Sequence, residues 1–108
     1  MNNSLLPDLL AFYEEDPNDP FNIYALAIEY VKSDSKKAEQ FFKILLTQHP
    51  DYLPTYYHAG AFFAALENVE QAEEIYQKGV ALALSQKNAR AHQELQRAYN
   101  TFLDELDD

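Results

Sequence analysis

The sequence repeats itself with a period of 33 to 34 residues, and this repeat limits the possible fold more than any other feature. In one half of the period the spacing is 33 residues, so that Ile23, Tyr24, Ala27 and Tyr30 correspond to Tyr56, Tyr57, Gly60 and Phe63. In the other half the spacing is 34 residues, so that Ala38, Glu39, Phe42 and Leu45 correspond to Ala72, Glu73, Tyr76 and Gly79. A period of this length is typical of stacked helical repeats, in which each unit is one supersecondary element.

Each period is predicted to contain two helices. Residues 23, 26, 27 and 30 are apolar, which is the i, i+3, i+4, i+7 spacing of one helix face. The second helix of this unit has Ser33, Asp34 and Ser35 as N-cap candidates, and Pro50 follows its end. Small residues at 27, 38, 60 and 72 allow paired helices to approach closely. The chain has only two glycines and five prolines, which also favours long helices, and we expect an all-α fold.

This pattern resembles that of the tetratricopeptide repeat (TPR) family. The family places a large residue, Leu-Gly and an aromatic on its first helix, then Ala, an aromatic, Ala and Pro on its second. The second unit matches as Tyr56, Ala59-Gly60, Phe63, Ala72, Tyr76 and Gly79, with Leu84 in place of the final Pro. The first unit matches as Ile23, Leu26-Ala27, Tyr30, Ala38, Phe42, Leu45 and Pro50. The motifs DPFNIYALAIEY and DYLPTYYHAG are similar to those of small bacterial proteins of this class. The resemblance implies an α-solenoid of antiparallel helix hairpins.

We expect one TPR-like domain over residues 1–108. Leu5, Leu9 and Phe12 precede Pro17 by the same offsets by which Ala38, Phe42 and Leu45 precede Pro50. The N-terminal segment is therefore predicted to be the second helix of a partial repeat. Ala91, Leu95, Ala98, Phe102 and Leu106 form one apolar stripe, which is typical of a capping helix. The predicted parts are a partial unit at 4–16, repeats at 20–50 and 53–86, and a capping helix at 88–106.

A partner-binding groove is the candidate functional site. In this family the first helices of successive units line a concave surface, so the resemblance implies groove positions at Phe21, Tyr24, Ile28, Val31, Pro54, Tyr57, Ala61 and Ala64. Independently of the resemblance, helix 20–32 carries a second apolar face at residues 21, 24, 28 and 31. We expect this face to pack against another part of the chain or against a partner.

Two interpretations of this face stay open. One is a groove that binds a protein or peptide weakly, with Tyr24 and Tyr57 as amphipathic anchors. The other is a structural role, in which the chain's own helices or a second copy in a homodimer cover the face. A subset of the family grips a terminal carboxylate with Lys and Asn, but the matching positions here include Tyr24, Ile28, Tyr57 and Ala61, so we do not expect that role.

Composition excludes several other function classes. The net charge of −10 comes almost entirely from the two ends of the chain, and it disfavours nucleic acid and anionic membranes as partners. No secretory signal or membrane span is expected, which predicts a cytoplasmic protein. Without cysteine there is no thiolate chemistry, and His49, His58 and His92 show no metal-ligand spacing. Two groups of neighbouring acids, Glu14–Glu15–Asp16 and Glu73–Glu74, could suggest an acid–base pair. Consecutive residues of a helix do not face each other, so we expect these carboxylates to be solvated. We expect no cofactor, no metal site and no catalytic activity.

Overall fold

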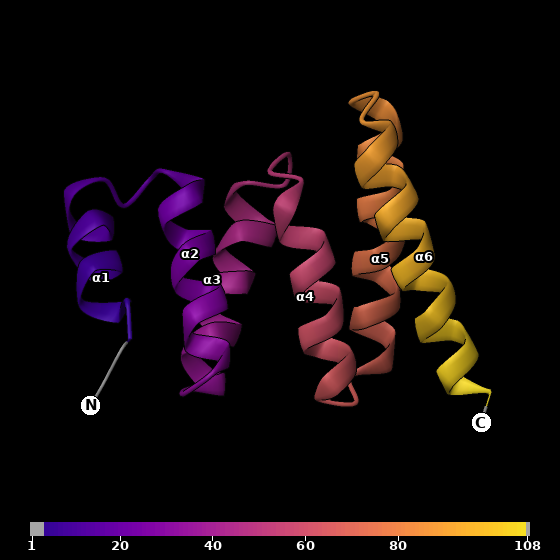
Figure 1. Ribbon diagram of the computed structural model, residues 1–108, viewed down its shortest axis with the longest axis horizontal. Coiled ribbons are helices and arrows are strands. Elements are labelled where there is room, and N and C mark those ends of the chain that lie inside the picture. The colour runs from indigo at the N-terminus through magenta and orange to yellow at the C-terminus, as the bar shows by residue number, and fades with distance from the viewer. Residues whose placement is uncertain (1–3, 108) are drawn as a thin grey trace. The chain divides into compact units, whose positions relative to one another are not determined.

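The computed structural model describes residues 4–107. Within that range the chain forms six helices and no strand, and the helices are α1 (Leu6–Glu15), α2 (Pro20–Val31), α3 (Ser35–Gln48), α4 (Pro54–Ala65), α5 (Val69–Ser85) and α6 (Ala89–Leu106). They divide into two compact units, residues 1–55 and 56–108. The helices α1 to α3 belong to the first unit, whereas nearly all of α4, together with α5 and α6, belongs to the second (Figure 1).

The core of the first unit lies between α2 and α3, which form a helix hairpin. Its buried side chains are Ile23, Leu26, Ala27 and Tyr30 from α2 and Ala38, Phe42 and Leu45 from α3. Of the three N-cap candidates for α3, the structure selects Asp34, whose carboxylate accepts a hydrogen bond from the backbone N–H of Lys37 at 3.2 Å. Asp19 caps α2 in the same way, and such caps satisfy N–H groups that have no partner within the helix.

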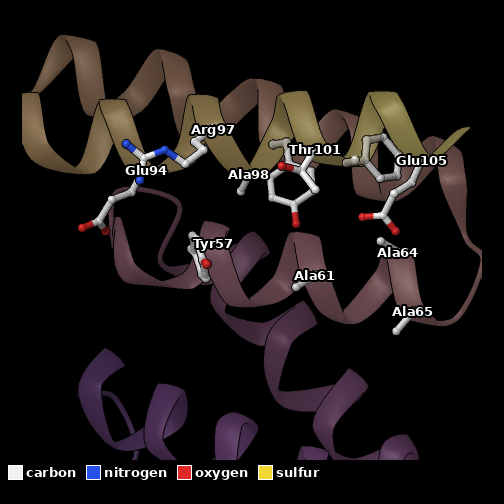
Figure 2. A pocket seen from close by; sticks show the side chains of 11 residues that line it. Tyr57, Ala61, Ala64, Ala65, Glu94, Arg97, Ala98, Thr101 and Glu105 are labelled. Carbon is white, nitrogen blue, oxygen red and sulfur yellow. The ribbon is translucent and has the colours of Figure 1, made fainter. Parts of the chain in front are cut away.

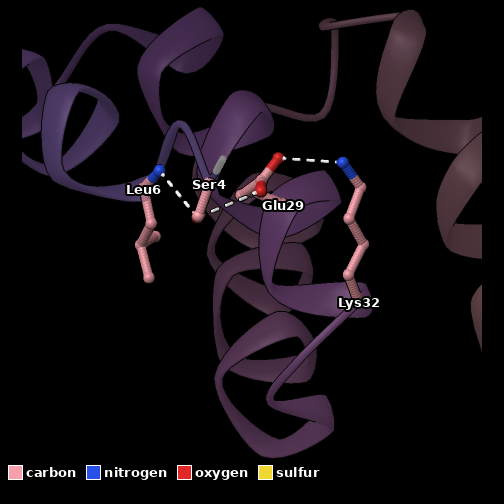
Figure 3. Close-up of polar contacts among 4 residues, drawn as sticks. All are labelled: Ser4, Leu6, Glu29 and Lys32. Carbon is pink, nitrogen blue, oxygen red and sulfur yellow. Dashed lines mark hydrogen bonds and ion pairs between the residues drawn. The ribbon is translucent and has the colours of Figure 1, made fainter. Parts of the chain in front are cut away.

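Helix α1 packs on α2, and one of its aromatic side chains also contacts α3. The ring of Tyr13 meets the ring of Phe41 edge-on, with centroids 5.6 Å apart. The hydroxyl of Ser4 accepts a hydrogen bond from the backbone N–H of Leu6 at 3.1 Å and donates one to Oε2 of Glu29 at 3.3 Å (Figure 3). Oε1 of Glu29 is 3.2 Å from Nζ of Lys32, so one glutamate ties the start of α1 to the end of α2.

Two apolar residues of the N-terminal segment differ from their counterparts in the first repeat. Leu5 and Phe12 are exposed, although Ala38 and Leu45, at the same offsets, are fully buried. The reason is that α2 covers the face of α3 that holds Ala38 and Leu45, whereas no described helix precedes α1 to cover its equivalent face. Leu5 also stands just outside the helix as its N-cap residue.

Two glycines set the close packing of the second unit. Gly60 of α4 faces the ring of Tyr76 on α5, and a Cβ atom added there would lie 2.6 Å from Cε1 of that ring. Gly79 of α5 faces Tyr56, and an added Cβ atom would lie 2.6 Å from the Cβ of Tyr56 and 3.2 Å from Cδ2 of Leu95 on α6. Since atoms this close would overlap, the absence of a side chain at each glycine is what allows the helices to approach.

The turns that end α4 and α5 have the same backbone geometry. Glu67 and Lys87 have positive φ angles of 61° and 58°. After α4, the N–H of Asn68 donates to the carbonyl of Phe63 at 3.0 Å, and the N–H of Glu67 donates to that of Ala64 at 3.0 Å. This pair of bonds is the Schellman arrangement, in which a left-handed residue terminates a helix. The turn after α5 has the same arrangement. There the backbone N–H of Asn88 donates to the carbonyl of Ala83, and the N–H of Lys87 donates to the carbonyl of Leu84.

The last helix covers one face of α5. Leu95 and Phe102 of α6 are buried, whereas Leu106, at the end of the predicted stripe, is exposed. The hydroxyl of Tyr99 donates a hydrogen bond to Oε2 of Glu73 on α5 at 3.0 Å and accepts one from Nε2 of Gln77 at 2.9 Å. The expected all-α fold of antiparallel helix hairpins is therefore confirmed.

Candidate functional site

The second apolar face of α2 is only partly covered in the first unit. Phe21 and Val31 are 57% and 47% exposed, and Tyr24 and Ile28 between them are half-buried. The rings of Phe21 and Tyr24 have their centroids 6.5 Å apart. The other side of Tyr24 meets Tyr52 edge-on, at a centroid distance of 5.7 Å. The face therefore presents two apolar side chains to solvent around an aromatic cluster.

The tyrosines of this cluster stay uncharged at neutral pH. Burial raises the pKa of Tyr24 above its ordinary value, and the neighbouring Tyr52 raises it further. Burial also raises the pKa of Tyr52, with a further contribution from Asp19. A neutral tyrosine offers an apolar ring and a hydroxyl to the same partner, which suits it to binding surfaces.

An open groove of about 770 Å³ lies within the second unit. Its walls are α4 and α6, and Tyr76 of α5 contributes to its lining (Figure 2). From α4 come Tyr57, Ala61, Ala64 and Ala65, and from α6 come Glu94, Arg97, Ala98, Thr101, Phe102 and Glu105. We call this the α4–α6 groove. Three of the predicted site residues, Tyr57, Ala61 and Ala64, are among its lining residues, and Tyr57 is 45% exposed.

The predicted site residues are divided between the two units. Phe21, Tyr24, Ile28 and Val31 belong to the unit of residues 1–55, and so does Pro54, which is exposed at the first position of α4. Pro54 does not line the α4–α6 groove. The structure thus brings the predicted residues together in two sets, one in each unit.

The sequence reasoning did not identify the polar wall of the α4–α6 groove. Glu94, Arg97, Thr101 and Glu105 occupy positions i, i+3, i+7 and i+11 of α6, which is the spacing of one helix face. That spacing is visible in the sequence, but α6 was interpreted only as a cap. Tyr76, which the sequence identifies only as an aromatic of the repeat pattern, also lines the groove.

His58 is a half-buried histidine of α4 next to Tyr57 in the sequence. His58 lies beside Tyr57, with ring centroids 5.4 Å apart, and burial lowers the pKa of its imidazole below the ordinary value. Among the described residues, no three His, Asp or Glu side chains gather in a way that could hold a metal ion. No helix of that part of the chain is both long enough and apolar enough to cross a membrane.

Comparisons with known proteins place this fold in a family. No family sequence model and no curated protein sequence matches the chain. Solved structures do match, and among them are two of tetratricopeptide repeat domain proteins from Salinibacter ruber. The crystal structure is 34% identical, covers 78% of this chain and 96% of the other, and has a TM-score of 0.73. The solution NMR structure is 36% identical, covers 81% of this chain and 89% of the other, and has a TM-score of 0.75. Identity at this level over most of both chains shows more than a shared fold: the chain belongs to the tetratricopeptide repeat family.

Proposed function

We propose that this chain is a non-catalytic binding module that holds another protein through exposed apolar side chains, those of α2 in the first unit and those of α4 in the second. The observation that carries the proposal is the exposure of Phe21, Val31 and Tyr57, three large apolar or aromatic side chains. On both helices the face opposite to them is fully occupied by hairpin packing. Side chains left uncovered in this way are available to a partner.

Magnitudes point to weak binding. Complete burial of one large apolar side chain is worth about 1.5–3 kcal/mol, so these three anchors supply roughly 4.5–9 kcal/mol before any cost is subtracted. Ordering a flexible segment takes back about 2–5 kcal/mol. A micromolar dissociation constant corresponds to about 8 kcal/mol, and we expect this partner to bind at that strength or more weakly.

The test is a capture experiment from native lysate with matched exposed phenylalanines. Phe21 and Phe12 are 57% and 55% exposed, but only Phe21 lies on the proposed binding face. Phe21→Ala and Tyr57→Ala should each reduce the capture of a specific protein, because each removes an anchor. Phe12→Ala should leave capture unchanged, and equal losses in all three variants would contradict the proposal.

Light scattering over a dilution series separates a foreign partner from a second copy of the chain. A monomer at all concentrations, together with capture that depends on Phe21, supports the proposal. A dimer that dissociates in Phe21→Ala would instead mean that this face is a homodimer interface.

A further inference from the structure

The floor of the α4–α6 groove has room for a long side chain. Ala61 and Ala64 lie one helical turn apart on α4 and leave space that a larger residue would fill. The ring of Phe102 gives the opposite wall an apolar portion. An unbranched aliphatic chain can therefore lie along this floor in contact with carbon atoms on both sides.

A tyrosine hydroxyl that makes no hydrogen bond within residues 4–107 opens into the same space. Tyr76 is only 4% exposed, yet its side chain lines the groove. Its hydroxyl makes no hydrogen bond to any residue in the range 4–107. Among the described residues the fully buried polar atom without a partner is Oγ1 of Thr55, so the Tyr76 hydroxyl retains contact with the open groove. Because buried polar groups are normally satisfied, this hydroxyl is suited to a bond with a ligand.

The charges along the groove are unevenly distributed. Figure 2 shows the carboxylate of Glu105 pointing from α6 toward Ala64 at one end, with Glu94 and Arg97 at the other. Glu94 forms an ion pair with Arg90, in which Nε of Arg90 lies 3.2 Å from Oε1 of Glu94. Glu105 has no ion pair among the described residues. Glu105 is close enough to Tyr76 to act on its hydroxyl electrostatically.

The charge of the whole second unit has the same sign as Glu105. Residues 56–108 contain nine acidic and four basic side chains, a net charge of −5. A field of this sign attracts a cation and repels an anion during association. An ammonium or guanidinium group also carries several donors, which matches the oxygen acceptors of Glu105 and Tyr76.

We infer that the α4–α6 groove binds a basic segment of the partner protein by taking up one Lys or Arg side chain. The aliphatic part of that side chain lies over Ala61 and Ala64, and its charged end lies between the Glu105 carboxylate and the Tyr76 hydroxyl. This inference rests on the proposed function and specifies the chemistry of the partner.

The probes are three pentapeptides that differ only at the central residue. They are acetyl-Ala-Ala-Lys-Ala-Ala-amide and its analogues with norleucine or glutamate at the centre, titrated into ¹⁵N-labelled protein and followed by amide chemical shifts. The lysine peptide should shift the amides of Ala64, Ala98 and Glu105. It should bind about tenfold more tightly than the norleucine peptide, since only lysine brings a charge-assisted hydrogen bond. The glutamate peptide should bind most weakly.

Neighbouring carboxylates on α6 provide the matched control. Glu105→Gln should reduce lysine-peptide affinity about tenfold and leave norleucine-peptide affinity unchanged. Asp104→Asn removes the same charge from the preceding residue, which does not line the groove, and should have little effect. Tyr76→Phe removes a hydroxyl that makes no bond within residues 4–107, so the fold should be kept while lysine-peptide affinity falls a few-fold.

Each contrary result has a distinct meaning. Equal affinity for the lysine and norleucine peptides would overturn the inference but leave an apolar binding groove, as the proposed function requires. Equal losses in Glu105→Gln and Asp104→Asn would also overturn it, because general attraction would then explain the preference. If no peptide shifts the groove while Phe21-dependent capture persists, only the inference fails. If no peptide shifts the groove and the wild-type protein also captures no partner that depends on Phe21, both the inference and the proposed function fail.

Discussion

Gly60 of α4 lies directly against the ring of Tyr76 on α5, with no space for a methyl group between them. A Cβ atom at this position would come within 2.6–2.8 Å of three ring carbons. The ring cannot move aside freely, because it also packs against Phe102 at a centroid distance of 5.6 Å.

Replacing this glycine should therefore destabilise the protein even though alanine favours helix more than glycine does. Gly60→Ala gains up to about 1 kcal/mol in helix propensity, and the overlap with Tyr76 costs about 1–3 kcal/mol. We expect a net loss in the free energy of unfolding, and a larger loss for Gly60→Leu, measured by urea denaturation. In a double-mutant cycle with Tyr76→Leu, the two losses should be less than additive, since the smaller side chain removes the overlap. A stabilised Gly60→Ala variant would show that the two helices are not packed in this register.

The turn residues with positive φ offer the opposite kind of substitution. Glu67 holds a left-handed conformation, with φ at 61°, that glycine adopts without steric cost. Glu67→Gly should raise the free energy of unfolding by about 0.5–1 kcal/mol, as measured by the same denaturation. Ser33→Gly in the α2–α3 turn is the control, because its φ is not positive, and it should give no gain. Equal effects at the two positions would mean that backbone strain is not responsible.

The hydroxyl of Tyr99 should contribute measurably to the contact between α5 and α6. Tyr99→Phe removes two hydrogen bonds, one to Glu73 at 3.0 Å and one from Gln77 at 2.9 Å. We expect a loss of about 1–2 kcal/mol in the free energy of unfolding. Tyr13→Phe is a matched control, because the Tyr13 hydroxyl makes no hydrogen bond within residues 4–107, and it should change stability by less than about 0.5 kcal/mol. A smaller loss for Tyr99→Phe than for Tyr13→Phe would rule out this role.

His58 should make stability depend on pH below neutrality. Burial lowers the pKa of His58 in the folded protein, whereas the unfolded chain takes up this proton at about pH 6.5. Between the two pKa values the unfolded state binds more protons, so stability falls as the pH is lowered. The contribution of neutral His58 to the free energy of unfolding is complete above about pH 6.5, and it is lost as the pH falls toward the pKa of His58 in the folded protein. Urea midpoints at pH 7.5, 6.5 and 5.5 should therefore fall more steeply for wild type than for His58→Gln, and parallel profiles would contradict this assignment.

Much of the fold could be predicted because its determinants are local and periodic. The spacing of Ile23, Leu26, Ala27 and Tyr30 identifies the buried face of α2, and all four are buried. Asp34 could be proposed as an N-cap but not selected from its two neighbours, because serine and aspartate cap comparably well. The exposure of Phe12 could not be predicted, since a residue's offset in a repeat does not say whether a helix covers it.

The candidate site was only partly predictable for a different reason. The apolar side of the α4–α6 groove comes from α4, whose repeat register identifies Tyr57, Ala61 and Ala64. Its polar side comes from α6, which contains alanines but lacks the small-residue signature of a repeat. Glu105 and Arg97 resemble solvated charges until the opposite wall of the groove is known.

The two Schellman turns also affect how the chain folds during synthesis. In the second unit, both chain reversals after α4 and α5 are closed by hydrogen bonds that span at most five residues. Chains whose contacts are close in sequence fold fast, because little loop entropy is lost before contacts form. Each hairpin of this unit can therefore close soon after its residues leave the ribosome, without waiting for distant parts of the chain.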